Sequence, residues 1–207
     1  MAAGHSRAAP RVLGLTGPIA CGKTTVGDIL LEMGAIERID ADEVVHELMA
    51  ARSDTTRTIA DTFGAGLIAA DGSIDRGALG TVVFGDETKL RTLESIVHPE
   101  VGRVIRRRVE ARAGQEGVVV VDAVKLLQSD LAEMCDAIWV VLCRPDVEMR
   151  RLTGKRGMTA EMARDRIAAQ PTFDDARISA VIENSESPAD LRRQVQELWE
   201  SSSLAAE

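Results

Sequence analysis

Aromatic residues, cysteine and histidine are scarce in this sequence. It has two Trp, three Phe and no Tyr among 207 residues. Proteins that bind single-stranded nucleic acids commonly stack the bases on aromatic side chains, so the scarcity of rings argues against that class. No apolar run approaches the 18 or so residues that a membrane-spanning helix needs. The first eleven residues also lack the apolar segment of a secretory signal, so we expect a cytoplasmic protein with no membrane partner.

The cysteines and histidines show no pattern of paired ligands. The three cysteines are Cys21, Cys135 and Cys143, an odd number without CxxC spacing, and the three histidines are scattered. Disulfide frameworks and structural zinc sites both need closely patterned residues. We therefore expect free thiols, a reducing compartment and no zinc site.

Acidic residues outnumber basic ones, 33 Asp and Glu against 25 Lys and Arg, and the formal net charge is −8. This balance argues against a protein that coats nucleic acid. A small polyanionic substrate remains compatible with it, because a local basic cluster can oppose the overall charge. With 45% hydrophobic residues, the chain is expected to form one large domain, or one domain with a modest insertion.

Short apolar runs alternate with helical patterns along the chain. The five runs cover residues 12–16, 35–39, 118–121, 137–142 and 180–182. Continuous apolar strands separated by helices are typical of a parallel sheet covered on both faces. The sequence therefore predicts the α/β class with about five parallel strands.

Two stretches interrupt this alternation. Residues 44–116 show helical patterns without a convincing strand, and we predict a helical insertion there, with Pro99 in the first turn of a helix. Residues 151–170 are predicted to form a helical lid in which Thr159 is an N-cap. The remaining segments are the core, 12–43, 117–150 and 171–200, and two tails, 1–11 and a frayed 201–207.

The most specific motif is a phosphate-binding loop. Residues 17–24 read Gly-Pro-Ile-Ala-Cys-Gly-Lys-Thr, which matches GxxxxGK[ST] between a predicted strand and a predicted helix. The glycines allow unusual φ angles, and the N–H groups that begin the helix hold phosphate. Lys23 would bridge the β- and γ-phosphates of ATP, and the Thr24 hydroxyl would bind Mg²⁺. The alternative is an ordinary glycine-rich turn between a strand and a helix.

Acidic residues follow two of the predicted strands. Asp40 and Asp42 come after the second strand, at the sheet edge where ligands bind in open α/β folds. One carboxylate could take a proton from an attacking hydroxyl, and one could position magnesium through water. Alternatively, one of them caps the next helix. Asp122 ends the third strand and is either a magnesium-directed carboxylate or a strand terminator.

Basic residues cluster near the predicted lid, where residues 144–156 carry a local charge of +3. Arginine from a closing lid stabilises the charge that develops on a transferred phosphoryl group. Arg151 and Arg166 are the leading candidates, and most other basic side chains are expected to be solvated. Cys21 lies near a helix N-terminus, which can lower the pKa of a thiol; a small buried filler is the simpler interpretation.

Together these motifs and several shorter ones resemble the dephospho-coenzyme A kinases over nearly the whole chain, from residue 12 to residue 199. The residues that carry the resemblance are 14–26, 39–42 with His46, 63–64, 71–72, 75–76 with 79–80, 83–84, 98–99, 151–152, 166–167 with Gln170, and 181–184.

The resemblance implies a three-layer P-loop kinase fold with a core, a helical substrate-binding insertion and a lid. It also implies transfer of the ATP γ-phosphate to the ribose 3′-hydroxyl of dephospho-coenzyme A, with Asp42 as the base. Lys23 and Arg151 complete the expected catalytic set, and Asp75, Arg76 and His98 are expected in or beside the substrate-binding helices. The expected ATP-binding residues are Gly17, Pro18, Ile19, Ala20, Cys21, Gly22, Lys23, Thr24, Thr25 and Asn184.

Some positions depart from the family pattern. The phosphate loop has Pro18 and Ala20 where the family usually has Gly, and Pro18 removes one backbone N–H. A lid arginine is replaced by Lys155, unless Arg156 takes its place. Two alternatives therefore stay open: another P-loop kinase of a small molecule or nucleotide, and a nucleotide-binding regulatory protein with little turnover.

Overall fold

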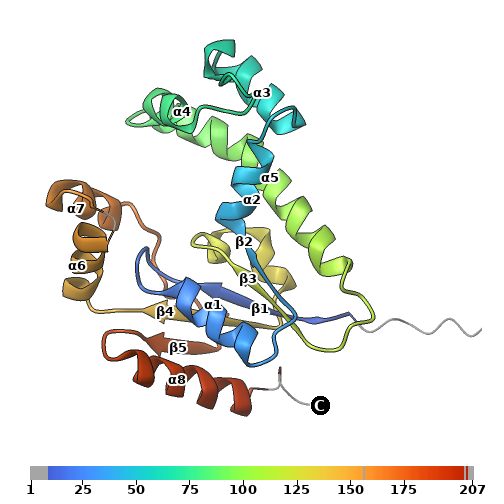
Figure 1. The fold of residues 1–207 in the computed structure, drawn as a ribbon, viewed down its shortest axis with the longest axis vertical. Coiled ribbons are helices and arrows are strands. Elements are labelled where there is room, and N and C mark those ends of the chain that lie inside the picture. The colour runs from blue at the N-terminus through green and yellow to red at the C-terminus, as the bar shows by residue number, and fades with distance from the viewer. Residues whose placement is uncertain (1–8, 156, 203, 205–207) are drawn as a thin grey trace, which may run out of the picture. The chain divides into compact units, whose positions relative to one another are not determined.

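The computed structural model describes residues 9–155, 157–202 and 204, and within them the strands form one five-stranded sheet in the order β2-β3-β1-β4-β5 (Figure 1). β1 pairs in parallel with β3 and β4, and β4 pairs in parallel with β5. The predicted parallel α/β sheet is therefore confirmed. The strands are β1 (Arg11–Thr16), β2 (Glu37–Asp40), β3 (Val118–Asp122), β4 (Ala137–Leu142) and β5 (Ala180–Glu183).

Helices cover both faces of this sheet and make three layers. α1 (Lys23–Glu32) and α8 (Pro188–Ser201) pack against each other (Figure 1) and share a buried cluster with Leu13 and Leu15 of β1. Because strand side chains alternate between faces, Gly14 points to the opposite side. There it lies against Leu126, in the short helix η2 (Leu126–Gln128). η3 (Asp130–Met134) follows directly.

Two short helices follow β4. α6 (Pro145–Lys155) and α7 (Ala160–Ala168) pack against each other, and Leu152 is fully buried. Thr159 is the N-cap of α7, as predicted, because its Oγ1 accepts a hydrogen bond from the N–H of Met162 at 3.2 Å. Arg156 and the side chain of Lys155, at which the sequence predicts a lid cation, lie outside the described residues.

The chain divides into two compact units. The first contains the sheet and comprises the residues up to Ile39 and from Val109 onward; the second is Asp40–Arg108. In the second unit the helices are α2 (Ala41–Leu48), α3 (Asp54–Phe63), η1 (Ala65–Leu67), α4 (Arg76–Val83) and most of α5 (Glu87–Glu110). This helical unit covers most of the residues expected in the insertion, 44–116.

Pro99 lies inside α5, and the prediction that it belongs to a first turn is wrong. The helix begins at Glu87. The carboxylate of the preceding residue, Asp86, accepts hydrogen bonds from the N–H groups of Thr88 and Lys89 in the first turn. Proline inside a helix removes one backbone hydrogen bond and costs about 3 kcal/mol. The helix continues because an apolar stripe is buried on both sides of the proline, at Val97, Val101, Ile105 and Val109.

The C-terminal tail also differs from expectation. The sequence predicts fraying over 201–207, yet Leu204 is buried and belongs to the cluster beneath α1 and α8. Ser202 continues the chain from α8 with a hydrogen bond from its Oγ to the Trp199 carbonyl. Among the described residues, no helix combines the length and the apolar character that crossing a membrane requires.

Candidate functional site

The phosphate-binding loop joins β1 to α1 through two glycines in the left-handed region. Gly17 has φ 140° and Gly22 has φ 100°. A Cβ atom at Gly17 would lie 2.1 Å from the Val141 carbonyl oxygen, and one at Gly22 would lie 2.1 Å from Asn184 Nδ2. Only glycine therefore fits at these two positions, for reasons of both backbone conformation and space.

The loop presents the start of a helix at the carboxyl edge of the sheet. α1 begins at Lys23, and its first N–H groups have no carbonyl one turn earlier to bind. These N–H groups and the positive end of the helix dipole favour an anion at this end of α1. The predicted strand–loop–helix context of the motif is present, which favours a phosphate site over an ordinary turn.

Lys23 folds back over the loop that precedes it. Its Nζ donates to the carbonyl oxygens of Gly17 at 2.9 Å and Pro18 at 3.1 Å. The ammonium group is therefore held beside the loop that is expected to bind the β- and γ-phosphates.

Arg151 of α6 joins the phosphate loop to the end of β5. Its guanidinium donates to the Ala20 carbonyl at 3.2 Å and to the Asn184 carbonyl at 3.0 Å. Asn184 is buried, and its Nδ2 donates to the Cys21 carbonyl at 2.7 Å. The structure thus brings together three sequence-predicted elements: the loop, Arg151 and Asn184.

The second lid candidate and its basic neighbours lie elsewhere. Arg166 is exposed on α7. Arg144 forms ion pairs with Asp146 and Glu186, and Arg150 lies 3.8 Å from the Asp146 carboxylate. Of the basic residues in this segment that the structure describes, Arg151 is the one that contacts the phosphate loop.

Glu148 and Gln170 also contact the site, and neither of them was predicted to have a role there. The Gln170 side chain accepts a hydrogen bond from the Ile19 N–H and donates one to Glu148 Oε1 at 2.8 Å. Glu148 is buried although it is charged. The available signal was its spacing, since Glu148 lies three residues before Arg151 and therefore on the same face of α6.

Cys21 is a buried filler and not an activated thiol. A hydrogen bond to Cys143, together with burial, raises the pKa of the Cys21 thiol well above its ordinary value. The same hydrogen bond, together with the positive charge of Arg151, lowers the pKa of Cys143. Burial raises the pKa of Cys135 to about 12. The thiol lies in the core, which confirms the interpretation of Cys21 as a small buried filler over activation by the helix N-terminus.

A magnesium ion could be held by oxygen ligands at this sheet edge. Thr24 is exposed in the first turn of α1, and Asp122 is a buried carboxylate that pairs in register with Leu15 on the neighbouring strand. Mg²⁺ commonly uses one or two protein oxygens together with water and substrate phosphates. Among the described residues no group of three or more His, Cys, Asp or Glu could hold a metal ion. Thr24 and Asp122 carry oxygen donors of this kind and fit a site that is completed by water and phosphate.

Asp40 and Asp42 have different structural positions. Asp40 ends β2 and is the N-cap of α2, where its Oδ1 accepts a hydrogen bond from the Asp42 N–H at 2.8 Å. Asp42 lies in the first turn of α2 with its side chain exposed. The cap interpretation is therefore confirmed for Asp40, and the carboxylate of Asp42 remains the candidate base.

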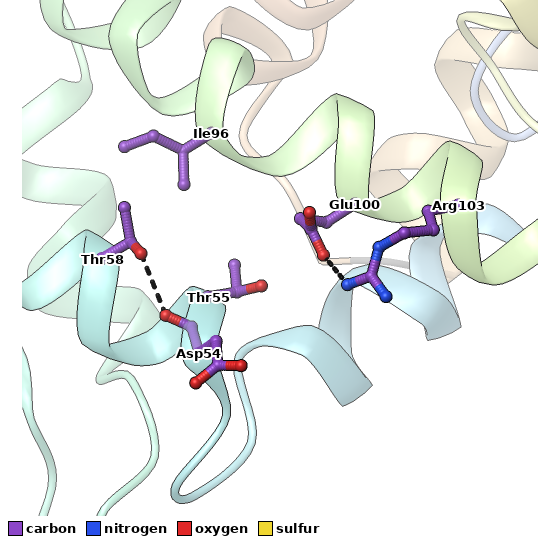
Figure 2. A pocket seen from close by; sticks show the side chains of 6 residues that line it. All are labelled: Asp54, Thr55, Thr58, Ile96, Glu100 and Arg103. Carbon is purple, nitrogen blue, oxygen red and sulfur yellow. Dashed lines mark hydrogen bonds and ion pairs between the residues drawn. The ribbon is translucent and has the colours of Figure 1, made fainter.

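The helical unit contains the other residues implied by the resemblance. Asp75 caps α4 by accepting from the Ala78 N–H at 3.0 Å, Arg76 begins that helix, and His98 is exposed on α5. None of the three lines the pocket of about 280 Å³ shown in Figure 2. The pocket is lined by Asp54, Thr55 and Thr58 of α3 and by Ile96, Glu100 and Arg103 of α5.

Arg103 in this pocket is engaged by its neighbour. Figure 2 shows the Glu100 and Arg103 side chains directed toward each other, and the ion pair between them raises the pKa of Arg103. The pocket contains none of the residues predicted to bind nucleotide or to catalyse transfer, so we assign it no role in the chemistry.

The sequence of this chain is similar to those of known dephospho-CoA kinases. A family model described as dephospho-CoA kinase matches residues 11–190. The dephospho-CoA kinase of Geobacter sulfurreducens is 36% identical over 191 residues, which cover 91% of this chain and 96% of that protein. The enzyme of the same name from Symbiobacterium thermophilum is 41% identical over 193 residues, which cover 91% of this chain and 80% of the relative.

The fold of this chain is also similar to that of a solved structure. A protein from Thermus thermophilus superimposes with a TM-score of 0.76 at 27% identity, covering 94% of this chain and all of its own. The family match spans the phosphate loop, Asp42, Arg151 and Asn184 together. By its sequence and by the arrangement of its phosphate loop, this chain belongs to the dephospho-CoA kinase family.

Proposed function

We propose that this protein transfers the γ-phosphoryl group of ATP to the ribose 3′-hydroxyl of dephospho-CoA, giving CoA and ADP. The observation that carries the proposal is the phosphate loop, in which Gly17 and Gly22 have the required φ angles and Lys23 and Arg151 converge on the loop. Family membership indicates which molecule accepts the phosphoryl group, because the related proteins are named dephospho-CoA kinases.

In the proposed reaction, the 3′-hydroxyl oxygen attacks the γ-phosphorus as the bond to the β,γ-bridging oxygen breaks. Asp42 accepts the hydroxyl proton, and ADP leaves with the electrons of the broken bond. When ATP binds, Lys23 exchanges loop carbonyl oxygens for phosphate oxygens, Arg151 keeps its contacts with the loop, and both cations stabilise the charge that develops on the phosphates.

Magnesium would be held by the Thr24 hydroxyl and by Asp122. Asp122 ends β3, which pairs with β1, the strand that leads into the phosphate loop. When bound, it neutralises charge on the β- and γ-phosphates. The cytoplasm is the compartment that we propose, because Cys21, Cys135 and Cys143 are all free thiols.

The proposal is tested by measuring ADP release in a coupled assay with dephospho-CoA, shikimate, gluconate, AMP or no acceptor. We expect release that depends on dephospho-CoA and on Mg²⁺, with CoA identified by mass spectrometry. Release with shikimate, gluconate or AMP instead would assign the protein to another acceptor. Tight ATP binding without turnover on any acceptor would leave a nucleotide-binding protein and contradict the enzyme assignment.

A further inference from the structure

Gln170 uses both ends of its carboxamide in the first unit. The carbonyl oxygen, Oε1, accepts from the Ile19 N–H in the phosphate loop, and Nε2 donates to Glu148 Oε1 at 2.8 Å. Gln170 follows α7, and Glu148 lies on α6. The side chain therefore connects the loop to the helical pair that follows β4.

The chemistry of the two partners requires an amide at this position. Glu148 is 6% exposed, and a buried carboxylate is stable only when hydrogen-bond donors satisfy it. The Ile19 N–H needs an acceptor. A glutamine has one donor end and one acceptor end, whereas glutamate at this position would place two carboxylates together.

The contact also determines which part of the loop can bind phosphate. Pro18 has no N–H, and the N–H of Ile19 is already used by Gln170. Phosphate contacts from the backbone therefore begin at Ala20, whose φ of 61° is in the left-handed region. If the N–H of Ile19 had no fixed partner, Ile19 would no longer help to hold the next residue, Ala20, in its strained conformation.

Arg151 depends on the same connection. It lies three residues after Glu148 on α6, and it reaches the carbonyl oxygens of Ala20 and Cys21 at 3.2 and 3.4 Å. Glu148, through Gln170, and Arg151 thus hold two adjacent parts of the loop from one helix face.

We infer that Gln170 is a positioning residue: it holds the phosphate loop and α6 in the arrangement that binds the ATP phosphates, and it acts through Ile19 and Glu148. The inference rests on ATP as the nucleotide in the proposed function, and it holds whichever acceptor is used. Nucleotide affinity is therefore the first measurement, because it is independent of turnover with dephospho-CoA.

The test compares four variants with the unaltered protein by calorimetric titration with ATP and by kinase assay. Gln170→Ala removes both contacts, and Gln170→Glu keeps the acceptor for Ile19 but faces Glu148 with a second carboxylate. Glu148→Gln combined with Gln170→Glu exchanges donor and acceptor between the two positions. Gln196→Ala, on the exposed surface of α8, is the matched control, since the Gln196 side chain donates to Glu200 one turn later in the same helix.

We expect Gln170→Ala to bind ATP about tenfold more weakly, because contacts involving a charged, buried partner are the strong ones. The Gln170→Glu variant should be at least as weak at pH 8. In the double variant the carboxylate introduced at position 170 can accept from both the Ile19 N–H and the amide introduced at position 148. Its affinity should therefore return to within about threefold of the unaltered protein. Gln196→Ala should not change the affinity.

The pH profile separates positioning from a general packing effect. Two adjacent carboxyl groups share one proton as the pH falls, and the protonated one then donates as the amide did. The ratio of the Gln170→Glu dissociation constant to that of the unaltered protein should therefore decrease from pH 8 to pH 5. Arg151, Lys23, Cys21 and Cys143 face these groups in both proteins, and the titration of ATP itself cancels in the ratio.

Two results would overturn the inference. One is an unchanged ATP affinity in Gln170→Ala with an unchanged unfolding midpoint. The other is a double variant that remains as weak as Gln170→Glu while it unfolds at the same urea concentration as the unaltered protein. Failure of the proposed function is distinct, since it appears as ATP binding by the unaltered protein without dephospho-CoA turnover.

Discussion

At the scale of single residues, the phosphate loop contains an L-residue in a conformation that glycine adopts more easily. Ala20 has φ 61°, and the carbonyl oxygen of this residue is held by Arg151 at 3.2 Å. A left-handed conformation costs a non-glycine residue about 1–2 kcal/mol. The tertiary contacts of the loop offset this cost.

Replacing Ala20 with glycine should relieve that strain. We expect Ala20→Gly to stabilise the protein by about 0.5–1 kcal/mol, because the relief exceeds the entropy that glycine adds to the unfolded chain. Urea unfolding measures the change. Arg52→Gly is a matched variant, since Arg52 has φ 64° in the helical unit. A destabilised Ala20→Gly would mean that the methyl group packs favourably enough to outweigh the strain.

Asp42 can be tested as the base by removing its charge alone. Asp42→Asn should retain ATP affinity and unfold normally, because the exposed side chain of Asp42 is not the cap of α2. Its kcat with dephospho-CoA should fall by about 10²–10⁴-fold, the range for general-base catalysis. Glu43→Gln, at the next exposed acid of the same helix turn, is the control. An unchanged kcat in Asp42→Asn would remove Asp42 from this role.

Cys143 should be the most reactive of the three thiols. Its lowered pKa gives it more thiolate at any given pH, whereas burial holds Cys135 to a pKa of about 12 and raises that of Cys21. With iodoacetamide, the rate at Cys143 should rise with pH and level off earliest. Cys21→Ala removes the stabilising hydrogen bond and should move this profile to higher pH. Site-resolved mass spectrometry measures the rates; faster labelling of Cys135 would contradict the expectation.

At the scale of secondary-structure elements, the strand positions and the cap of α7 are predictable from the sequence, whereas the start of α5 is not. The apolar runs located all five strands of the sheet to within two residues at each end, and Thr159 caps α7 as its sequence suggests. The prediction for Pro99 is wrong because local preference favours proline in the first turn of a helix. The buried stripe of α5 shows that the helix instead continues through Pro99.

The cap of α2 offers a test at this scale. Asp40→Ala removes the oxygen that accepts from the Asp42 N–H and should destabilise the protein by about 1 kcal/mol. Asp40→Asn keeps an acceptor in the same place and should recover most of the loss. Urea unfolding monitored by circular dichroism measures both variants. Equal losses in the two would show that the carboxylate charge, and not the cap, is what matters.

At the scale of the whole molecule, the residues of the loop that we propose to bind ATP belong to the first unit, which is discontinuous in sequence. Residues 17–25 precede the helical unit, and Arg151 and Asn184 follow it. If ATP binds there as we propose, it would stabilise contacts between segments that are distant in the sequence.

ATP should raise the free energy of unfolding by about 2.7 kcal/mol at a concentration about one hundred times its dissociation constant. Amide hydrogen exchange should slow in residues 17–25 and in α1. Lys23→Ala is expected to lose most of the stabilisation at the same ATP concentration, because its ammonium would no longer bind phosphate. A thermal unfolding series with ATP measures this. No shift in Tm for the unaltered protein would exclude nucleotide binding at the loop.

The acidic overall charge has a local exception. Residues 144–156 carry +3, and Arg151 from this segment contacts the phosphate loop, although Arg144 and Arg150 are engaged by nearby carboxylates. Net charge therefore predicted little about the ligand, and a single arginine in contact with the loop is more informative than the size of the basic cluster.

Local sequence patterns are enough to predict the α/β class, the five strands and the phosphate loop, because periodicity and glycine spacing act over a few neighbouring residues. Three features become clear from the folded chain: Asp40 caps α2, Cys21 is buried against Cys143, and Gln170 joins Ile19 to Glu148. Each of the last two features joins residues that lie far apart in the sequence. Their partners are chosen by how the helices pack on the sheet, which local patterns do not record.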